Sequence, residues 1–163
     1  SALELVELVK ESTKLEIGVA AFPEVHPESP DMAHDSKVLR LKQNAGASFA
    51  VTQLFFSVEA YRELLTSASA AGWDLPIVPG VMPIANAKQV LRMAELSGAA
   101  IPATLLQSLE SAKDEAEARE VGMRYSTQLA VDLLAAGAPG IHIFTLNHDA
   151  AALELARGAG LCR

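Results

Sequence analysis

The sequence predicts an α/β fold made of parallel strand–helix units. Short, almost wholly apolar runs occur at residues 17–22, 47–55, 76–81 and 141–145, and segments with helical spacing of apolar residues separate them. This alternation is typical of parallel βα units rather than of sandwiches or helix bundles. Apolar runs without alternation indicate strands that are buried on both faces. Because the chain begins on a helix and has four such strands, we expect half of an eight-stranded barrel, with exposed edges and one open face.

The composition favours a single globular domain over residues 1–163. Apolar residues make up 50% of the chain and charged residues 20%, so the chain can bury a sizeable core. The net charge of −7 disfavours binding to nucleic acids or anionic membranes, which requires clustered Lys and Arg. The single cysteine, Cys162, leaves no internal disulfide and indicates a reducing compartment. The sequence has neither a run of the roughly 20 apolar residues that span a bilayer nor a signal peptide, so we expect a cytoplasmic protein.

The first half of the chain is predicted to contain three helices. Residues 2–12 place Leu3 and Val6 at helical spacing among Glu and Lys residues. The second helix covers residues 31–43, with Asp31 as its N-cap. The third begins at residue 57 or 58 and continues to residue 71, where Gly72 ends it.

The second half is predicted to contain four more helices. Gly98 ends a helix over residues 87–97, and Pro102 suits the first turn of a short helix that reaches residue 111. A longer helix over residues 114–136 precedes the fourth strand, and a helix over residues 149–159 follows that strand.

Ligands of such folds bind at the carboxyl ends of the strands, so we expect functional residues there. Those ends are residues 23–26, 52–53, 79–83 and 145–148. Gln53 is unusual because it lies near the end of an otherwise apolar strand. A buried amide without hydrogen-bond partners costs about 1–3 kcal/mol, so Gln53 must bind either backbone groups or a ligand.

Several common kinds of site are disfavoured. Glu24, His26, Glu28, His34 and Asp35 lie close in sequence, but their spacing matches no recognised metal-binding motif, and we expect no metal site. The sequence lacks a Gly-x-Ser-x-Gly turn and the glycine-rich phosphate loops of nucleotide-binding folds. No strand end offers the Schiff-base lysine that a lyase or aldolase would need.

The remaining basic residues allow more than one interpretation. Lys37, Arg40 and Lys42 follow the first strand and either bind a phosphate or form a solvated helix face. His142 lies inside a strand and is interpreted as a core histidine. His148 follows the strand end and is a candidate for contact with an anion when it is protonated.

Four motifs, in the same order, resemble the methylenetetrahydrofolate reductase family. They are AAFPEVHPE at residues 20–28, AGA at 45–47 with TQLFF at 52–56, PGVMP at 79–83 and HIFTLN at 142–147. The resemblance covers about residues 2–161. It implies that the chain is the C-terminal half of a (β/α)8 TIM barrel, strands five to eight, in which residues 47–55 form the sixth strand.

The resemblance also implies a flavoprotein of one-carbon metabolism and methionine biosynthesis. In this family a hydride passes from NADH or NADPH to bound FAD, and then to 5,10-methylenetetrahydrofolate to give 5-methyltetrahydrofolate. Carried over by motif, the FAD-binding residues are Phe22, His26, Ser29, Asp35 and Lys42. The folate-binding residues carried over in the same way are Gln53, which would face the pterin, Gln89 and His148.

The chain departs from the family pattern in three places. The family's general acid, a glutamate, and an aspartate that tunes the flavin are expected upstream of Ser1, so no catalytic residue is assigned. His148 replaces a common arginine that reaches the glutamate tail of folate, which should weaken that contact at neutral pH. Phe22 replaces a common tyrosine. We expect a homo-oligomer; the alternative to the enzyme is a non-catalytic half-barrel scaffold that associates with itself or with a partner half.

Overall fold

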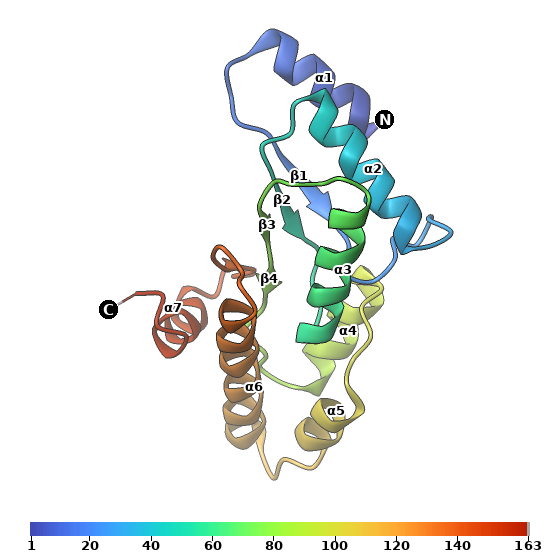
Figure 1. The fold of residues 1–163 in the computed structure, drawn as a ribbon. Coiled ribbons are helices and arrows are strands. Elements are labelled where there is room, and N and C mark those ends of the chain that lie inside the picture. Colours follow the sequence, from blue (N-terminus) through green and yellow to red (C-terminus); the bar gives the residue numbers. More distant parts are fainter. Residues whose placement is uncertain (163) are drawn as a thin grey trace.

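The computed structural model describes residues 1–162, in which helices alternate with short parallel strands (Figure 1). The helices are α1 (Ala2–Ser12), α2 (Met32–Ala45), α3 (Val58–Ala70), α4 (Ala87–Ser97), α5 (Ala103–Glu110), α6 (Glu115–Ala135) and α7 (Asp149–Gly158). The strands are β1 (Gly18–Ala21), β2 (Phe49–Thr52), β3 (Ile77–Val78), β4 (Gly80–Val81) and β5 (His142–Ile143). The α/β class with parallel strands is therefore confirmed.

The predicted third strand, residues 76–81, is interrupted at Pro79. β2 pairs in parallel with β1 on one side and with β3 on the other, whereas β4 pairs in parallel with β5. Proline has no N–H to donate to a neighbouring strand, and the Pro79 carbonyl accepts a hydrogen bond from the His142 N–H at 2.9 Å. The chain thus changes its pairing partner at Pro79, while the strands keep their sequential order.

One side-chain hydrogen bond joins the two sheets at this point. The buried Thr52 hydroxyl, at the end of β2, accepts a hydrogen bond from the Gly80 N–H of β4 at 2.8 Å. Thr52 was expected only as the end of a strand; its side chain takes the place of a main-chain partner where the ladder is broken.

Asp31 and Gly98 cap their helices as the sequence predicts. The Asp31 side chain accepts a hydrogen bond from the His34 N–H at 2.7 Å, which caps α2, and Asp114 caps α6 in the same way. Gly98 ends α4 with a φ of 75°, a conformation that glycine adopts without steric cost. Among the described residues, no helix is both long and apolar enough to cross a membrane.

Helices cover one face of the sheet, and the other face is more open. Helices α1, α2 and α3 pack side by side beside β1–β3, and α6 contacts α3 and β4 (Figure 1). Burial alternates along β1 and β2: Val19 and Ala50 are buried, whereas Ala20 is exposed and Phe49 and Val51 are only partly buried. The prediction that these strands are buried on both faces is wrong within residues 1–162, because no described helix covers the second face.

The core places the start of α4 against the middle of α6. Ile84, just before α4, is 2% exposed and belongs to a cluster with Leu54, Phe56, Met82 and Val90. Gly122 of α6 allows this approach, because a Cβ atom at that position would lie 2.3 Å from the Ile84 carbonyl oxygen. The packing fixes the loop between β4 and α4, which belongs to the site described below.

Candidate functional site

Two cavities lie where the strands end, and we call them the α2 cavity and the α7 cavity. The α2 cavity, of about 570 Å³, is lined by Ser1, Ala2, Leu3, Ala20, Ala21, Phe22, His26, Glu28, Ser29, Asp35, Val38, Leu39, Leu41 and Lys42. The α7 cavity, of about 340 Å³, is lined by Met82, Pro83, Ala85, Gln89, Arg119 and residues 144–151. All five residues predicted to bind FAD line the α2 cavity.

Asp35 organises the loop that follows β1. Its carboxylate is 8% exposed and accepts hydrogen bonds from the His26 N–H at 2.8 Å and from the Ser29 hydroxyl. Such bonds to a charged acceptor contribute about 1.5–3 kcal/mol each, so they hold the loop strongly against α2. Asp35 therefore shapes the wall of the α2 cavity by fixing where His26 and Ser29 lie.

The α2 cavity combines an aromatic pair with a cationic side chain. The rings of Phe22 and His26 meet edge to face, with their centroids 4.5 Å apart. Lys42 is partly buried; this burial lowers the pKa of its ammonium group, and the nearby Asp35 carboxylate opposes the shift. A desolvated ammonium beside an apolar wall suits a ligand with a ring at one end and an anionic group at the other.

Glu24 connects the β1 loop with a distant turn. Its carboxylate accepts a hydrogen bond from the Ala100 N–H at 2.7 Å, across 76 positions of sequence. Burial raises the pKa of the Glu24 carboxyl above its usual value, and the bond from Ala100 offsets part of the rise. Glu24 thus has a structural partner, and it does not line either cavity.

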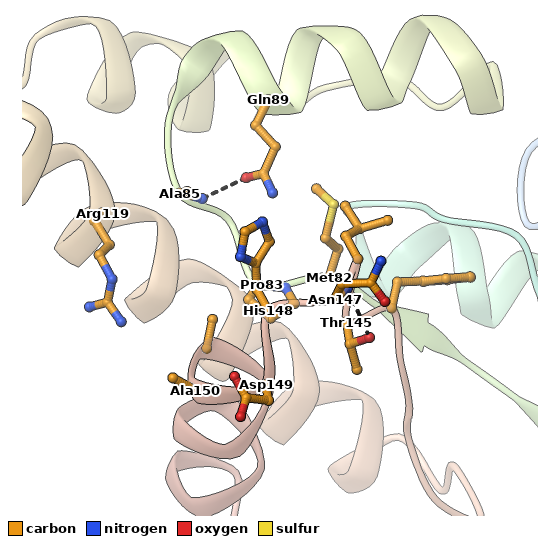
Figure 2. Close-up of a pocket in the computed structure, with 13 residues that line it drawn as sticks. Met82, Pro83, Ala85, Gln89, Arg119, Thr145, Asn147, His148, Asp149 and Ala150 are labelled. Atoms are coloured by element: carbon orange, nitrogen blue, oxygen red, sulfur yellow. Dashed lines mark hydrogen bonds between the residues drawn. The ribbon is translucent and has the colours of Figure 1, made fainter.

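The α7 cavity brings together two of the three residues predicted to bind folate. Gln89, on α4, and His148, at the start of α7, face the same space in Figure 2. The Gln89 amide oxygen accepts a hydrogen bond from the Ala85 N–H at 2.7 Å, which fixes the side chain and leaves its NH₂ group for a ligand (Figure 2). Two strand ends expected to carry function, residues 79–83 and 145–148, contribute to this cavity.

The segment after β5 has an unusual backbone. Leu146 and Asn147 both have positive φ values, 48° and 64°. Asparagine tolerates this conformation, but for leucine it costs about 1–3 kcal/mol and is typical of segments whose shape serves a site. Both residues line the α7 cavity. The motif at residues 142–147 is therefore bent so that its polar end faces the cavity.

Gln53 lies outside both cavities. Its side chain is partly buried, and its amide oxygen accepts a hydrogen bond from the Leu54 N–H at 2.9 Å. The backbone partner that the sequence left open as one explanation is thus present. The amide NH₂ keeps its capacity to donate, and a contact with the pterin stays a prediction.

The fold also shows where other ionisable residues lie. The prediction of His142 as a core histidine is wrong: its side chain is exposed on β5 and meets the Phe144 ring at 4.7 Å between centroids. Arg40 donates to the Gly72 carbonyl at 2.5 Å, and Lys37 is exposed, so neither lines the α2 cavity. Across residues 1–162, no three His, Cys, Asp or Glu side chains gather as a metal site would require.

Arg119 is a cavity residue that sequence reasoning missed. It lies on α6, and its guanidinium donates a hydrogen bond to the Glu154 carboxylate of α7 while lining the α7 cavity. The sequence prediction considered the carboxyl ends of strands, and Arg119 lies on a helix rather than at such an end. Arg119 lies near the start of the longest helix, and the sequence pattern of that helix does not mark it as a site residue.

Comparison with known proteins identifies the family. A sequence profile described as methylenetetrahydrofolate reductase matches residues 1–160. The chain belongs to the methylenetetrahydrofolate reductase family. It is 39% identical to the 5,10-methylenetetrahydrofolate reductase of Escherichia coli (strain K12) over 147 residues, which cover 90% of this chain and 50% of that protein. It is 36% identical over 172 residues to methylenetetrahydrofolate reductase (NADH) 1 of Arabidopsis thaliana, covering 98% of this chain and 29% of that one.

The chain spans about half the length of its bacterial methylenetetrahydrofolate reductase relatives and less of the longer ones. Among solved structures, an uncharacterized protein from Clostridium thermocellum matches with a TM-score of 0.63 at 19% identity, over 96% of this chain and 58% of that one. That structure is described as binding two copies of 5-methyl-5,6,7,8-tetrahydrofolic acid. At this identity the likeness concerns the fold alone.

Proposed function

We propose that this chain forms the C-terminal half of the catalytic barrel of a methylenetetrahydrofolate reductase. The full-length protein would reduce 5,10-methylenetetrahydrofolate to 5-methyltetrahydrofolate with NADH or NADPH through bound FAD. The observation that carries the proposal is the convergence of Phe22, His26, Ser29, Asp35 and Lys42 on one cavity. Family membership supports it.

The residues of the α2 cavity fit a flavin dinucleotide. Lys42 can neutralise a phosphate oxygen, and the Phe22 and His26 rings offer an apolar contact for the flavin or ribityl part. A cavity of about 570 Å³ lies within the range of small-molecule sites, about 300–1,000 Å³. A bound flavin would supply the hydride transfer, while these residues bind and orient it.

The α7 cavity fits part of a folate. The free amide NH₂ of Gln89 can donate to an acceptor on the pterin edge, and Asn147 adds a second amide on the same cavity. The strained Leu146 and Asn147 backbone would hold that amide in place without an entropic cost on binding.

The open sheet face supports the half-barrel interpretation. Phe49 lies over Gly18 and is only partly buried, so an aromatic ring occupies the face of β1 and β2 that the described helices leave uncovered. Apolar side chains on a sheet face gain free energy when they are covered, at about 25 cal/mol per Å². We propose that the other half of the barrel covers this face in the full-length protein. The same face favours a second candidate, a non-catalytic half barrel that covers it with another copy.

The decisive experiment uses the full-length protein and two lysine variants. Lys42→Gln should weaken FAD binding at least tenfold, because it removes the cation of the α2 cavity. Lys37→Gln is the matched control on the same helix, since Lys37 is exposed outside the cavity, and it should bind FAD like the wild type. Flavin absorbance after gel filtration measures binding, and NAD(P)H oxidation measures turnover.

A wild-type protein without a flavin absorbance band and without folate-dependent NAD(P)H oxidation would exclude the enzyme. A stable, flavin-free dimer would then favour the scaffold. We expect the isolated 163-residue chain to bind FAD poorly and to show negligible turnover, because residues expected from the other half would be absent.

A further inference from the structure

The α7 cavity has an uneven distribution of polar groups. Amide side chains occupy the walls formed by α4 and by the segment after β5, through Gln89 and Asn147. Arg119 lies on the α6 wall, across the cavity from Asn147 in Figure 2. Arg119 is the one Arg or Lys among the described residues that line this cavity.

Arg119 keeps donors for a ligand although it already has a partner. One nitrogen, Nη2, donates to Glu154, and within residues 1–162 its side chain makes no other protein hydrogen bond. A guanidinium has five N–H donors, so most of them stay available. Both side chains of this ion pair are about half exposed, at 49% and 47%, and such exposed pairs contribute little to stability. The ion pair therefore orients the Arg119 side chain and leaves most of its N–H donors available for a ligand.

A folate has the complementary distribution of polar groups. Its pterin ring has neutral donors and acceptors, and its glutamate has carboxylates that pair with guanidinium in a planar, two-bond geometry. Resting on the proposed function, we propose that Arg119 binds the glutamate carboxylates of folate and thereby determines the preference for folates over pterins without a glutamate. His148 was expected to make this contact, but a guanidinium is always charged and presents a planar fork of donors that matches a carboxylate, which an imidazole lacks.

The test measures binding of two probes to the full-length protein by calorimetry, at about pH 6 and pH 8. The probes are 5-methyltetrahydrofolate and 6-methyltetrahydropterin, which lacks the carboxylates. Arg119→Gln should weaken the folate about tenfold or more at both pH values and leave the pterin within twofold. Arg124→Gln is the matched control, since Arg124 lies on α6, pairs with Glu120 and does not line the cavity. It should bind both probes like the wild type.

A second variant separates ligand binding from the ion pair. Glu154→Gln removes the partner of Arg119 but keeps the guanidinium, so it should bind the folate within about threefold of the wild type. If Glu154→Gln weakens the folate as much as Arg119→Gln does, the effect comes from the ion pair and the inference is wrong. It is also wrong if Arg119→Gln weakens both probes equally, or if His148→Gln alone removes the preference. A wild type that binds neither probe would overturn the proposed function itself.

Discussion

Replacing Gly122 by alanine should destabilise the protein, although alanine favours a helix more than glycine does. The new Cβ would lie 2.3 Å from the Ile84 carbonyl oxygen and 2.7 Å from its Cγ2, so the loop before α4 must move away. Ile84 is 2% exposed, and its N–H donates to the buried Ser126 hydroxyl at 3.0 Å. A displacement large enough to relieve the clash therefore breaks this hydrogen bond as well.

The magnitude follows from three contributions. Overpacking a tight contact costs about 1–3 kcal/mol, and an unpartnered buried N–H costs a similar amount. Alanine returns about 1 kcal/mol of helix propensity. The free energy of unfolding should therefore fall by about 3 kcal/mol, which shifts a urea midpoint by about 1.5 M for an m-value near 2 kcal/mol/M.

Urea titration followed by circular dichroism measures this difference. Gly140→Ala is the matched control, because a Cβ there would meet no atom within 4 Å, and it should change stability by less than about 0.5 kcal/mol. A Gly122→Ala protein as stable as the wild type, with Gly140→Ala unchanged, would refute the reasoning about the Ile84 contact.

Two further predictions concern single hydrogen bonds. Thr52→Val leaves the Gly80 N–H without its buried partner and should cost about 1–3 kcal/mol of unfolding free energy, whereas Thr52→Ser keeps the hydroxyl and should cost less; equal losses would contradict a role for this bond. Glu24→Gln keeps an oxygen for the Ala100 N–H but cannot ionise. Because burial raises the folded-state pKa of Glu24 above its ordinary 4.5, ionisation lowers wild-type stability as the pH rises through that region. The variant should therefore gain relative stability from about pH 4 to pH 7 in thermal melts, and a pH-independent difference would contradict this assignment.

The helices could be predicted well because their signals are local. Asp31 caps α2 as expected, Asp114 caps the helix that it was expected to begin, and Gly98 ends α4. These residues act on the backbone within one turn, so sequence alone carries the information.

The strands were harder because their lengths depend on partners. Residues 76–81 look like one apolar run, yet Pro79 divides them between two ladders. An apolar run also cannot reveal which side of a strand is covered. Phe49 and Val51 therefore appeared fully buried, whereas their face is open in the described residues.

The site was predictable where a motif specified it and not where the fold assembled it. The five residues from Phe22 to Lys42 belong to one loop and one helix, so they stay together in space. Arg119 is separated by about 30 residues from the strand end that it faces, and only the packing of α6 against α7 brings it there.

Because the Gly80 N–H donates to Thr52, its amide proton can report by NMR on the junction between the two sheets. The α2 cavity stands at the end of the ladder formed by β1 and β2, and the α7 cavity at the end of the ladder formed by β4 and β5. The Gly80 amide proton is shared by neither ladder but lies between them. In a protein labelled with ¹⁵N-glycine, the chemical shift of this amide should therefore change when a ligand in either cavity shifts one ladder against the other. Its rate of hydrogen exchange with solvent should report how often the two ladders separate.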